Sequence, residues 1–221
     1  MIKACIFDLD GVIVDTAKYH YLAWKKLAEE KLGVHFDHED NEHLKGVSRI
    51  ASLEYILDKG NLHIHDDDKF ELASLKNKWY VDLIENLDSS EILPGSESLL
   101  MDLKANQIKI ALGSASKNAI AILKSIGLFH YFDFISDGNS TDKSKPDPAV
   151  FLIAAKGVGL DPNECIVFED SIKGIEAAIT GGFHSIGIGD PQILQQADYV
   201  VDNLADVNWQ VLDTWFNTTK N

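Results

Sequence analysis

Positive charge is scarce in this sequence. Its 221 residues hold 20 lysines and arginines against 35 aspartates and glutamates, a formal net charge of −15, and the single arginine is Arg49. A chain this acidic repels the phosphate backbone of nucleic acids, so DNA and RNA are excluded as main partners. Small anionic ligands remain compatible with it, but their site has to gather the few cations in one place.

Cysteine is also rare, and long hydrophobic runs are missing. Cys5 and Cys165 each lie in a short apolar stretch, which favours buried thiols in a reducing compartment over a disulfide framework. No apolar run approaches the length that crosses a bilayer, and no secretory leader opens the sequence. We expect a soluble cytoplasmic protein that does not bind membranes.

Short apolar runs alternate with helical patterns through most of the chain. Strands are predicted at 2–8, 108–114, 132–136, 165–170, 184–189 and 197–202, and helices at 95–107, 117–127, 148–159 and 171–182. Strands that alternate with helices form a parallel sheet covered on both faces. We therefore expect a doubly wound, Rossmann-like α/β fold, which binds ligands beyond the carboxyl ends of its strands.

Residues 17–87 interrupt this alternation, because they show helical periods only. The periods cover 17–33, 48–60 and 66–87. An all-helical insertion directly after the first strand lies over that strand's carboxyl end, where it can cover a ligand. We expect an α/β core of residues 1–15 and 88–221 and an inserted helical cap of residues 16–87, with hinges near 14–16 and 88–90.

Chemically active side chains occur at four points that this fold brings to one edge of the sheet. They are Asp8 with Asp10, Ser114, Lys145, and Glu169 with Asp170. Carboxylates at the end of a buried strand repel one another and resist desolvation, so their convergence calls for a cation. Hard oxygen ligands select Mg²⁺. The sequence therefore predicts a magnesium site.

The same residues suit phosphoryl transfer. Ser114, with the backbone N–H groups of the following helix start, and Lys145 can bind phosphate oxygens. Asp8 is then the nucleophile, and Asp10, two residues further on, is the proton donor and acceptor. Singly, each residue has an ordinary alternative as a turn cap, helix cap or surface charge. The combination of all four is much harder to explain that way.

These residues resemble the four motifs of the haloacid dehalogenase superfamily of phosphotransferases. The motifs are DLDGVIVDT (8–16), Ser114, Lys145 and Glu169–Asp170, and the resemblance covers residues 2–202, with the helical insertion where the superfamily places a cap. Further stretches are similar to the β-phosphoglucomutase family: DTAKYHYLAWKKLAEE (15–30), HLKGVSR (43–49), LKN (75–77), SASKN (114–118) and SKP (144–146).

The resemblance implies interconversion of β-D-glucose 1-phosphate and β-D-glucose 6-phosphate through β-glucose 1,6-bisphosphate, which also serves as activator. It implies that Asp8 carries the phosphoryl group while Asp10 moves the proton. Mg²⁺ is then held by the Asp8 carboxylate, the Asp10 backbone carbonyl, Glu169 and Asp170. The implied residues around Asp10 and the sugar are Thr16, His20, Trp24, Lys45, Gly46, Ser52, Lys76 and Ala115.

Such a mutase holds two phosphates, one reacting and one at rest. We call the place of the resting group the second phosphate site, and we predict that it contains Arg49 from the cap and Ser116, Lys117 and Asn118 from the core. Arginine suits this role because it binds phosphate through two parallel hydrogen bonds. The alternative is that Arg49 is a surface charge opening the helix at 48–60, although basic residues favour the other end of a helix.

Two other functions stay open at this point. A phosphatase of the same superfamily would share the aspartyl-phosphate step but admit water, and would hydrolyse hexose phosphates or other small phosphoesters. A receiver-like module switched by phosphorylation would have no use for Asp10, Lys145 or the cap. In each enzymatic case, the expected substrates are small phosphorylated sugars or similar esters, and we expect a monomer.

Overall fold

The structure is a computed structural model that describes residues 2–85 and 87–218. Within these ranges, six strands form one parallel sheet: β1 (Ala4–Phe7), β2 (Lys109–Gly113), β3 (Phe134–Ser136), β4 (Cys165–Glu169), β5 (His184–Ile188) and β6 (Tyr199–Val201). Their order in space is β3-β2-β1-β4-β5-β6. The predicted strands and the doubly wound fold are confirmed, with each strand shorter than its apolar run.

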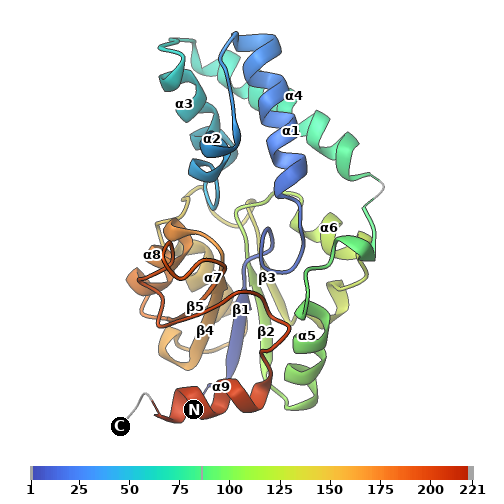
Figure 1. The fold of residues 1–221 in the computed structure, drawn as a ribbon, viewed down its shortest axis with the longest axis vertical. Coiled ribbons are helices and arrows are strands. Elements are labelled where there is room, and N and C mark those ends of the chain that lie inside the picture. Colours follow the sequence, from blue (N-terminus) through green and yellow to red (C-terminus); the bar gives the residue numbers. More distant parts are fainter. Residues whose placement is uncertain (1, 86, 219–221) are drawn as a thin grey trace.

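Helices cover both faces of the sheet (Figure 1). Residues of α5 (Ser96–Ala105), α6 (Ala119–Ser125) and α9 (Trp209–Thr218) pack in one core cluster, and residues of α7 (Ala149–Gly157) and α8 (Ile172–Thr180) pack in another. Because successive side chains of a strand point to opposite faces, β1 contributes Cys5 and Phe7 to the first cluster and Ala4 and Ile6 to the second. Both cysteines are free and buried.

Four helices lie beyond the carboxyl ends of the strands (Figure 1). They are α1 (Ala17–Leu27), which continues into a π-helical turn at Ala28–Leu32, α2 (His38–His43), α3 (Arg49–Lys59) and α4 (Asp66–Ile84). They share an apolar cluster of their own, which includes Trp24, Leu27, Phe36, Leu53 and Ile56. Near the sheet, Ala23, Tyr80 and Ile84 instead join the first core cluster. These helices therefore have their own core and a second apolar contact at their base.

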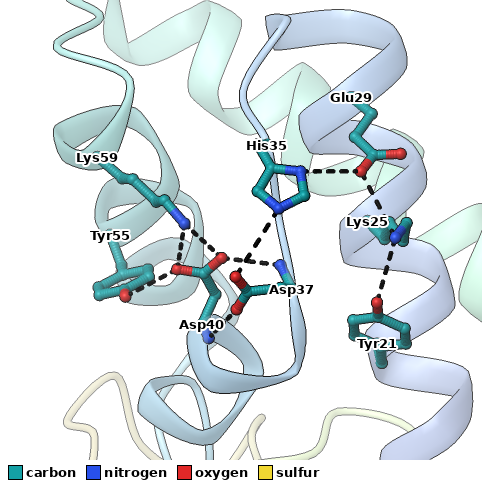
Figure 2. A network of polar contacts seen from close by, with 8 residues as sticks. All are labelled: Tyr21, Lys25, Glu29, His35, Asp37, Asp40, Tyr55 and Lys59. Atoms are coloured by element: carbon teal, nitrogen blue, oxygen red, sulfur yellow. Dashed lines mark hydrogen bonds and ion pairs between the residues drawn. The ribbon is translucent and has the colours of Figure 1, made fainter.

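The short helix α2 was not predicted, because its sequence HEDNEH has no apolar period. Polar contacts hold it instead (Figure 2). Asp37 and Asp40 form a capping box in which each carboxylate accepts a hydrogen bond from the other's backbone N–H. The buried Asp40 carboxylate also accepts hydrogen bonds from the Tyr55 hydroxyl at 3.2 Å and from Lys59 Nζ at 2.6 Å and 2.5 Å.

Two segments connect the sheet region with these four helices, one before α1 and one after α4, and they are hydrogen-bonded to each other. Leu93 N–H donates to the Ile13 carbonyl at 3.0 Å, and Asp15 N–H donates to the Glu91 carbonyl at 2.9 Å. The Glu91 carboxylate accepts hydrogen bonds from Lys18 and Tyr19 at the start of α1. Short 3₁₀ turns lie at Ser89–Glu91, Phe129–Tyr131 and Pro162–Glu164. Within the described ranges, no helix has the length and apolarity needed to cross a membrane.

Candidate active site

The central strands place two carboxyl groups at the edge of the sheet that faces the cap. Phe7 of β1 is in register with Phe168 of β4, and their rings stack with centroids 4.6 Å apart. Asp8 follows Phe7 directly, and Glu169 is the last residue of β4. The chain winds outward in opposite directions from these two neighbouring strands, which opens a crevice where such folds bind ligands.

Lys145 lies between these two carboxylates. Its Nζ donates to Asp8 Oδ1 at 2.6 Å and to Glu169 Oε1 at 2.5 Å, and all three side chains are buried. Burial raises the pKa of Asp8 to about 6, although the charge of Lys145 opposes this shift. Burial alone would lower the pKa of Lys145, but Asp8 and Glu169 outweigh it and the pKa is raised. The core thus holds a lysine that stays charged beside its own counter-ions.

A third acid completes a group that fits a divalent cation. Carboxylate oxygens of Asp8, Glu169 and Asp170 all lie within 4.8 Å of one another. Burial, and then the neighbouring Glu169, raise the pKa of Asp170 well above its usual value. A bound Mg²⁺ would relieve this repulsion, and three hard oxygen donors are the ligands it prefers. The residues present therefore fit the ion.

Two glycines make room for these acids. A Cβ atom at Gly11, where φ is +82°, would lie 2.2 Å from Asp170 Oδ2, and one at Gly174 would lie 1.9 Å from the carboxyl carbon of Glu169. Ser171 fixes the far oxygen of Glu169 through its backbone N–H at 2.7 Å and its hydroxyl at 2.8 Å. The acids are thus oriented by the backbone around them.

Asp10 is not one of these three acids and lies beside Thr16, which directly precedes α1. It is half-buried and accepts a hydrogen bond from the hydroxyl of the buried Thr16. Withdrawal from solvent, together with the negative charge of Asp8, raises the pKa of Asp10 to about 7. A carboxyl group with a pKa near neutrality can both give and take a proton at physiological pH. This property suits the predicted role of Asp10.

The cap presents a second buried lysine to the same cavity. Lys76 on α4 is 2% exposed, its Nζ is 2.8 Å from His20 Nδ1, and it lies over the rings of Trp24 and Tyr80. Burial lowers the pKa of Lys76 well below its usual value, and the charge of Arg49 lowers it further. Burial and then Lys76 likewise lower the pKa of His20, so its imidazole is neutral and can accept the hydrogen bond.

Arg49, in the first turn of α3, is partly buried near Lys76. Its Nη2 donates to Asn77 Oδ1 at 2.6 Å. In the part of the chain that the structure describes, no carboxylate lies within ion-pair distance of Arg49 or Lys76. Since a desolvated cation without a counter-charge is costly, these two residues call for an anion from outside the chain.

A cavity of about 450 Å³ joins these groups between the cap and the sheet. The predicted site residues that line it are Asp8, Asp10, His20, Trp24, Lys45, Gly46, Arg49, Ser52, Lys76, Ser114, Ala115, Ser116, Lys117, Asn118, Lys145 and Asp170. Thr16 and Glu169 lie behind the wall, fully buried, where they contact Asp10 and Lys145. Lys45 Nζ also approaches Asp170 Oδ2 to 3.5 Å.

Some residues of the cavity were not predicted from the sequence. Ser48 N–H donates to Ser144 Oγ at 3.3 Å across the cleft, and Asn77 joins Arg49 to Asn118. Behind the cavity wall, the buried Tyr80 was also missed, although its ring packs against His20 with centroids 4.1 Å apart. Asn77 follows the predicted Lys76 in the LKN stretch, but its partners lie 28 and 41 positions away in the chain, and nothing local points to them.

Known proteins are similar to this chain in sequence and in fold. The haloacid dehalogenase-like hydrolase family matches residues 2–182. The β-phosphoglucomutase of Bacillus subtilis is 43% identical over 95% of this chain and 93% of its own length. The fructose-1-phosphate phosphatase of Escherichia coli is 32% identical over 83% of this chain and 94% of its own. A solved β-phosphoglucomutase structure from Clostridium difficile has a TM-score of 0.96 and 46% identity, covering 99% of both chains.

These findings confirm the resemblance inferred from the motifs, with matches that extend through the cap as well as the core. The chain belongs to the haloacid dehalogenase-like hydrolase family.

Proposed function

We propose that this enzyme interconverts β-D-glucose 1-phosphate and β-D-glucose 6-phosphate. The observation that carries the proposal is that some cations of the cavity have carboxylate partners and others do not. Lys145 is paired with core carboxylates, whereas Arg49 and Lys76 face the same cavity and have no carboxylate partner among the residues that the structure describes. A cavity with cations on both walls suits a sugar that carries two phosphates. The relatives in Bacillus subtilis and Clostridium difficile are both named as this mutase.

The first half of the reaction forms a phosphoenzyme. An Asp8 oxygen attacks the phosphorus at C1 of β-glucose 1,6-bisphosphate, the bond from that phosphorus to the sugar oxygen breaks, and Asp10 gives its proton to that oxygen, so that glucose 6-phosphate is released. The hydroxyl group of Ser114 and the ammonium group of Lys145 donate hydrogen bonds to the oxygens of the phosphoryl group that is transferred. When bound by Asp8, Glu169, Asp170 and the Asp10 carbonyl, Mg²⁺ would neutralise charge on the transferring group.

The second half reverses these steps on the free 6-hydroxyl of a β-glucose 1-phosphate molecule, which becomes the bisphosphate. Asp10 now takes the proton of the attacking hydroxyl, whose oxygen accepts the phosphoryl group from Asp8. The phosphate that does not react rests at Arg49, Ser116, Lys117 and Asn118. In this proposal, β-glucose 1,6-bisphosphate is the intermediate and the activator, because it can phosphorylate Asp8 from either end.

The proposal assigns separate work to two domains. Residues 1–15 and 88–221 form the core that carries out transfer, and residues 16–87 form the cap that excludes water; of these, residues 1, 86 and 219–221 lie outside the described part. Transfer to sugar then exceeds hydrolysis, because water does not reach the Asp8 phosphate while the cap is closed. We also propose that the enzyme works as a cytoplasmic monomer.

The test is to incubate the protein with Mg²⁺, β-glucose 1-phosphate and a catalytic amount of the bisphosphate. We expect glucose 6-phosphate as the main product, with a requirement for the bisphosphate. Release of inorganic phosphate as the main product would favour the second candidate, a sugar phosphatase, in keeping with the name of the Escherichia coli relative. Formation of neither product would contradict both.

A further inference from the structure

One side chain joins the cap to the core at the cationic wall of the cavity. Asn77 on α4 accepts a hydrogen bond at Oδ1 from Arg49 Nη2 at 2.6 Å and another from Asn118 Nδ2 at 3.0 Å. Arg49 belongs to α3 of the cap, and Asn118 lies directly before α6 of the core. Since arginine has donors only, the Asn77 atom facing it is the carbonyl oxygen, and Asn118 must donate its amide to the same atom.

The two donors that meet at Asn77 are also two of the residues assigned to the second phosphate site. We propose that Asn77 is a positioning residue, which holds Arg49 and Asn118 together so that the second phosphate meets a preformed site. This inference rests on the proposed function, because it concerns the same phosphate. It adds a residue that contacts neither the reacting phosphorus nor the metal ligands.

The hydrogen-bonding capacity of the three side chains supports this role. A guanidinium has five N–H donors and a carboxamide has two, so Asn77 uses one donor of Arg49 and one of Asn118 and leaves the others for phosphate oxygens. Asn77 carries no charge and therefore does not compete with an anion for the guanidinium. Fixing a long side chain before the ligand arrives reduces the entropy that binding has to offset.

The position of this contact complements the other polar links between cap and core. Lys173 Nζ donates to the His43 carbonyl at 3.2 Å, which connects α8 with the end of α2. Figure 1 shows α6 and α8 on opposite sides of the molecule. Asn77 therefore supplies a link to the start of α6, where the second phosphate has to bind both domains.

The experiment compares Asn77→Ala and Asn77→Asp with the same two changes at Asn163. Asn163 is an exposed asparagine in the turn before β4 and does not line the cavity. For each variant, KM for β-glucose 1,6-bisphosphate and kcat are measured, together with the rate at which acetyl phosphate phosphorylates Asp8. Acetyl phosphate has one phosphate group and does not require the second phosphate site.

We expect Asn77→Ala to raise KM for the bisphosphate about tenfold, the effect of losing roughly one hydrogen bond. The acetyl phosphate rate should stay within about twofold of the wild type, since the reacting groups are unchanged. Asn77→Asp should raise KM further, because its carboxylate pairs with Arg49 and repels the phosphate. Both Asn163 variants should match the wild type.

Two outcomes would overturn the inference. One is an unchanged KM in Asn77→Ala, and the other is an equal loss in the bisphosphate and acetyl phosphate reactions, which would indicate general structural damage. Failure of the proposed function would be seen in the wild type, which would then form no glucose 6-phosphate. In that case, Asn77 is judged by calorimetric binding of glucose 6-phosphate with Mg²⁺, where equal Kd values for wild type and Asn77→Ala would refute its role.

Discussion

Lys145 in the core and Lys76 in the cap are both 2% exposed and face the same cavity, yet their surroundings are opposite. Lys145 lies between the carboxylates of Asp8 and Glu169, which raise its pKa against the effect of burial. Lys76 lies against a neutral imidazole and two aromatic rings, and burial lowers its pKa. The core balances the charge of Lys145 within the chain, whereas in the cap the charges of Lys76 and its neighbour Arg49 are left to be balanced by a ligand.

Under the proposed function, this difference separates the work of the two regions. In the core, Asp8, Glu169 and Lys145 are joined in a network within the chain. The cap gains a counter-charge when an anion enters, so anion binding should stabilise the contact of the cap with the core. The apolar base formed by Ala23, Tyr80 and Ile84 keeps the cap attached in either state.

The largest expected effect comes from removing the proposed nucleophile, Asp8, from the core. We expect Asp8→Asn to lower turnover on the order of 10⁴-fold or more, since the side chain can no longer form the phosphoryl ester. The fold should persist, because asparagine has nearly the same shape and can still accept a hydrogen bond from Lys145. Steady-state rates and mass spectrometry of the phosphoenzyme check this, and substantial residual turnover would remove Asp8 from the nucleophile role.

Replacing each lysine by methionine tests the comparison directly. Lys145→Met should lower the free energy of unfolding by about 3 kcal/mol in the metal-free protein, because Asp8 and Glu169 lose the charge between them. Lys76→Met should leave that free energy unchanged or raise it, since it removes a buried cation that has no carboxylate partner.

Urea unfolding at pH 7 with a chelator measures both lysine variants. The lowered pKa of Lys76 also predicts the direction in which stability changes with pH. The unfolded chain binds the Lys76 proton more tightly, so the wild type should gain stability relative to Lys76→Met as pH rises from the lowered pKa towards 10.5. Equal losses of stability in the two variants would contradict the comparison.

The carboxyl groups of the core give a pH dependence of comparable size. The ordinary pKa of both Asp8 and Asp10 is 3.8. In the folded protein, the pKa is about 6 for Asp8 and about 7 for Asp10. Folding therefore favours the protonated form, so the stabilisation from protonated Asp8 is complete below pH 3.8 and is lost as pH rises through about 6. One pKa unit corresponds to about 1.4 kcal/mol, so the loss for Asp8 is on the order of 3 kcal/mol.

This loss can be isolated by comparing metal-free wild type with Asp8→Asn at pH 4.5 and at pH 8, limits chosen to bracket roughly the shifted pKa. The wild type should lose more stability than the variant over this interval, and Mg²⁺ should reduce the difference because it favours the ionised acid. A difference between wild type and variant that does not change with pH would contradict the raised pKa of Asp8.

Much of the core could be predicted from the sequence, because local patterns determine it. Apolar runs such as 2–8 and 165–170 identify central strands, and a parallel sheet brings whatever follows them to one edge. Asp8, Ser114 and Glu169 could therefore be placed together without knowing any contact. Their roles as a set followed from the chemistry of carboxylates, a hydroxyl and an ammonium group.

The cap was less predictable, because its contacts depend on how helices pack. Helix α2 has no apolar period, although Asp37 and Asp40 have the spacing of a capping box and could have been recognised. Outside the cap, the C-terminal helix α9 was also not predicted. Arg49 was chosen as the single arginine, but its bond to Asn77 depends on the alignment of α3 with α4, which no local pattern encodes.

The smallest effect should come from the polar network of Asp37, Asp40, Tyr55 and Lys59 inside the cap. It sharpens the comparison because these four residues do not line the cavity. Asp40→Ala removes half of the capping box of α2 and the partner of Lys59, and should lower the free energy of unfolding by about 1 kcal/mol. Because Lys59 is partly exposed and regains water, the loss should be smaller than that of Lys145→Met, where both abandoned acids are buried.

Phosphorylation of Asp8 by acetyl phosphate should proceed at the wild-type rate in Asp40→Ala, since the core is untouched. Urea unfolding and that rate, measured on the same preparation, check both parts. If the rate fell along with the stability, the cap network would be coupled to the nucleophile, and the division between a self-balanced core and a ligand-balanced cap would fail.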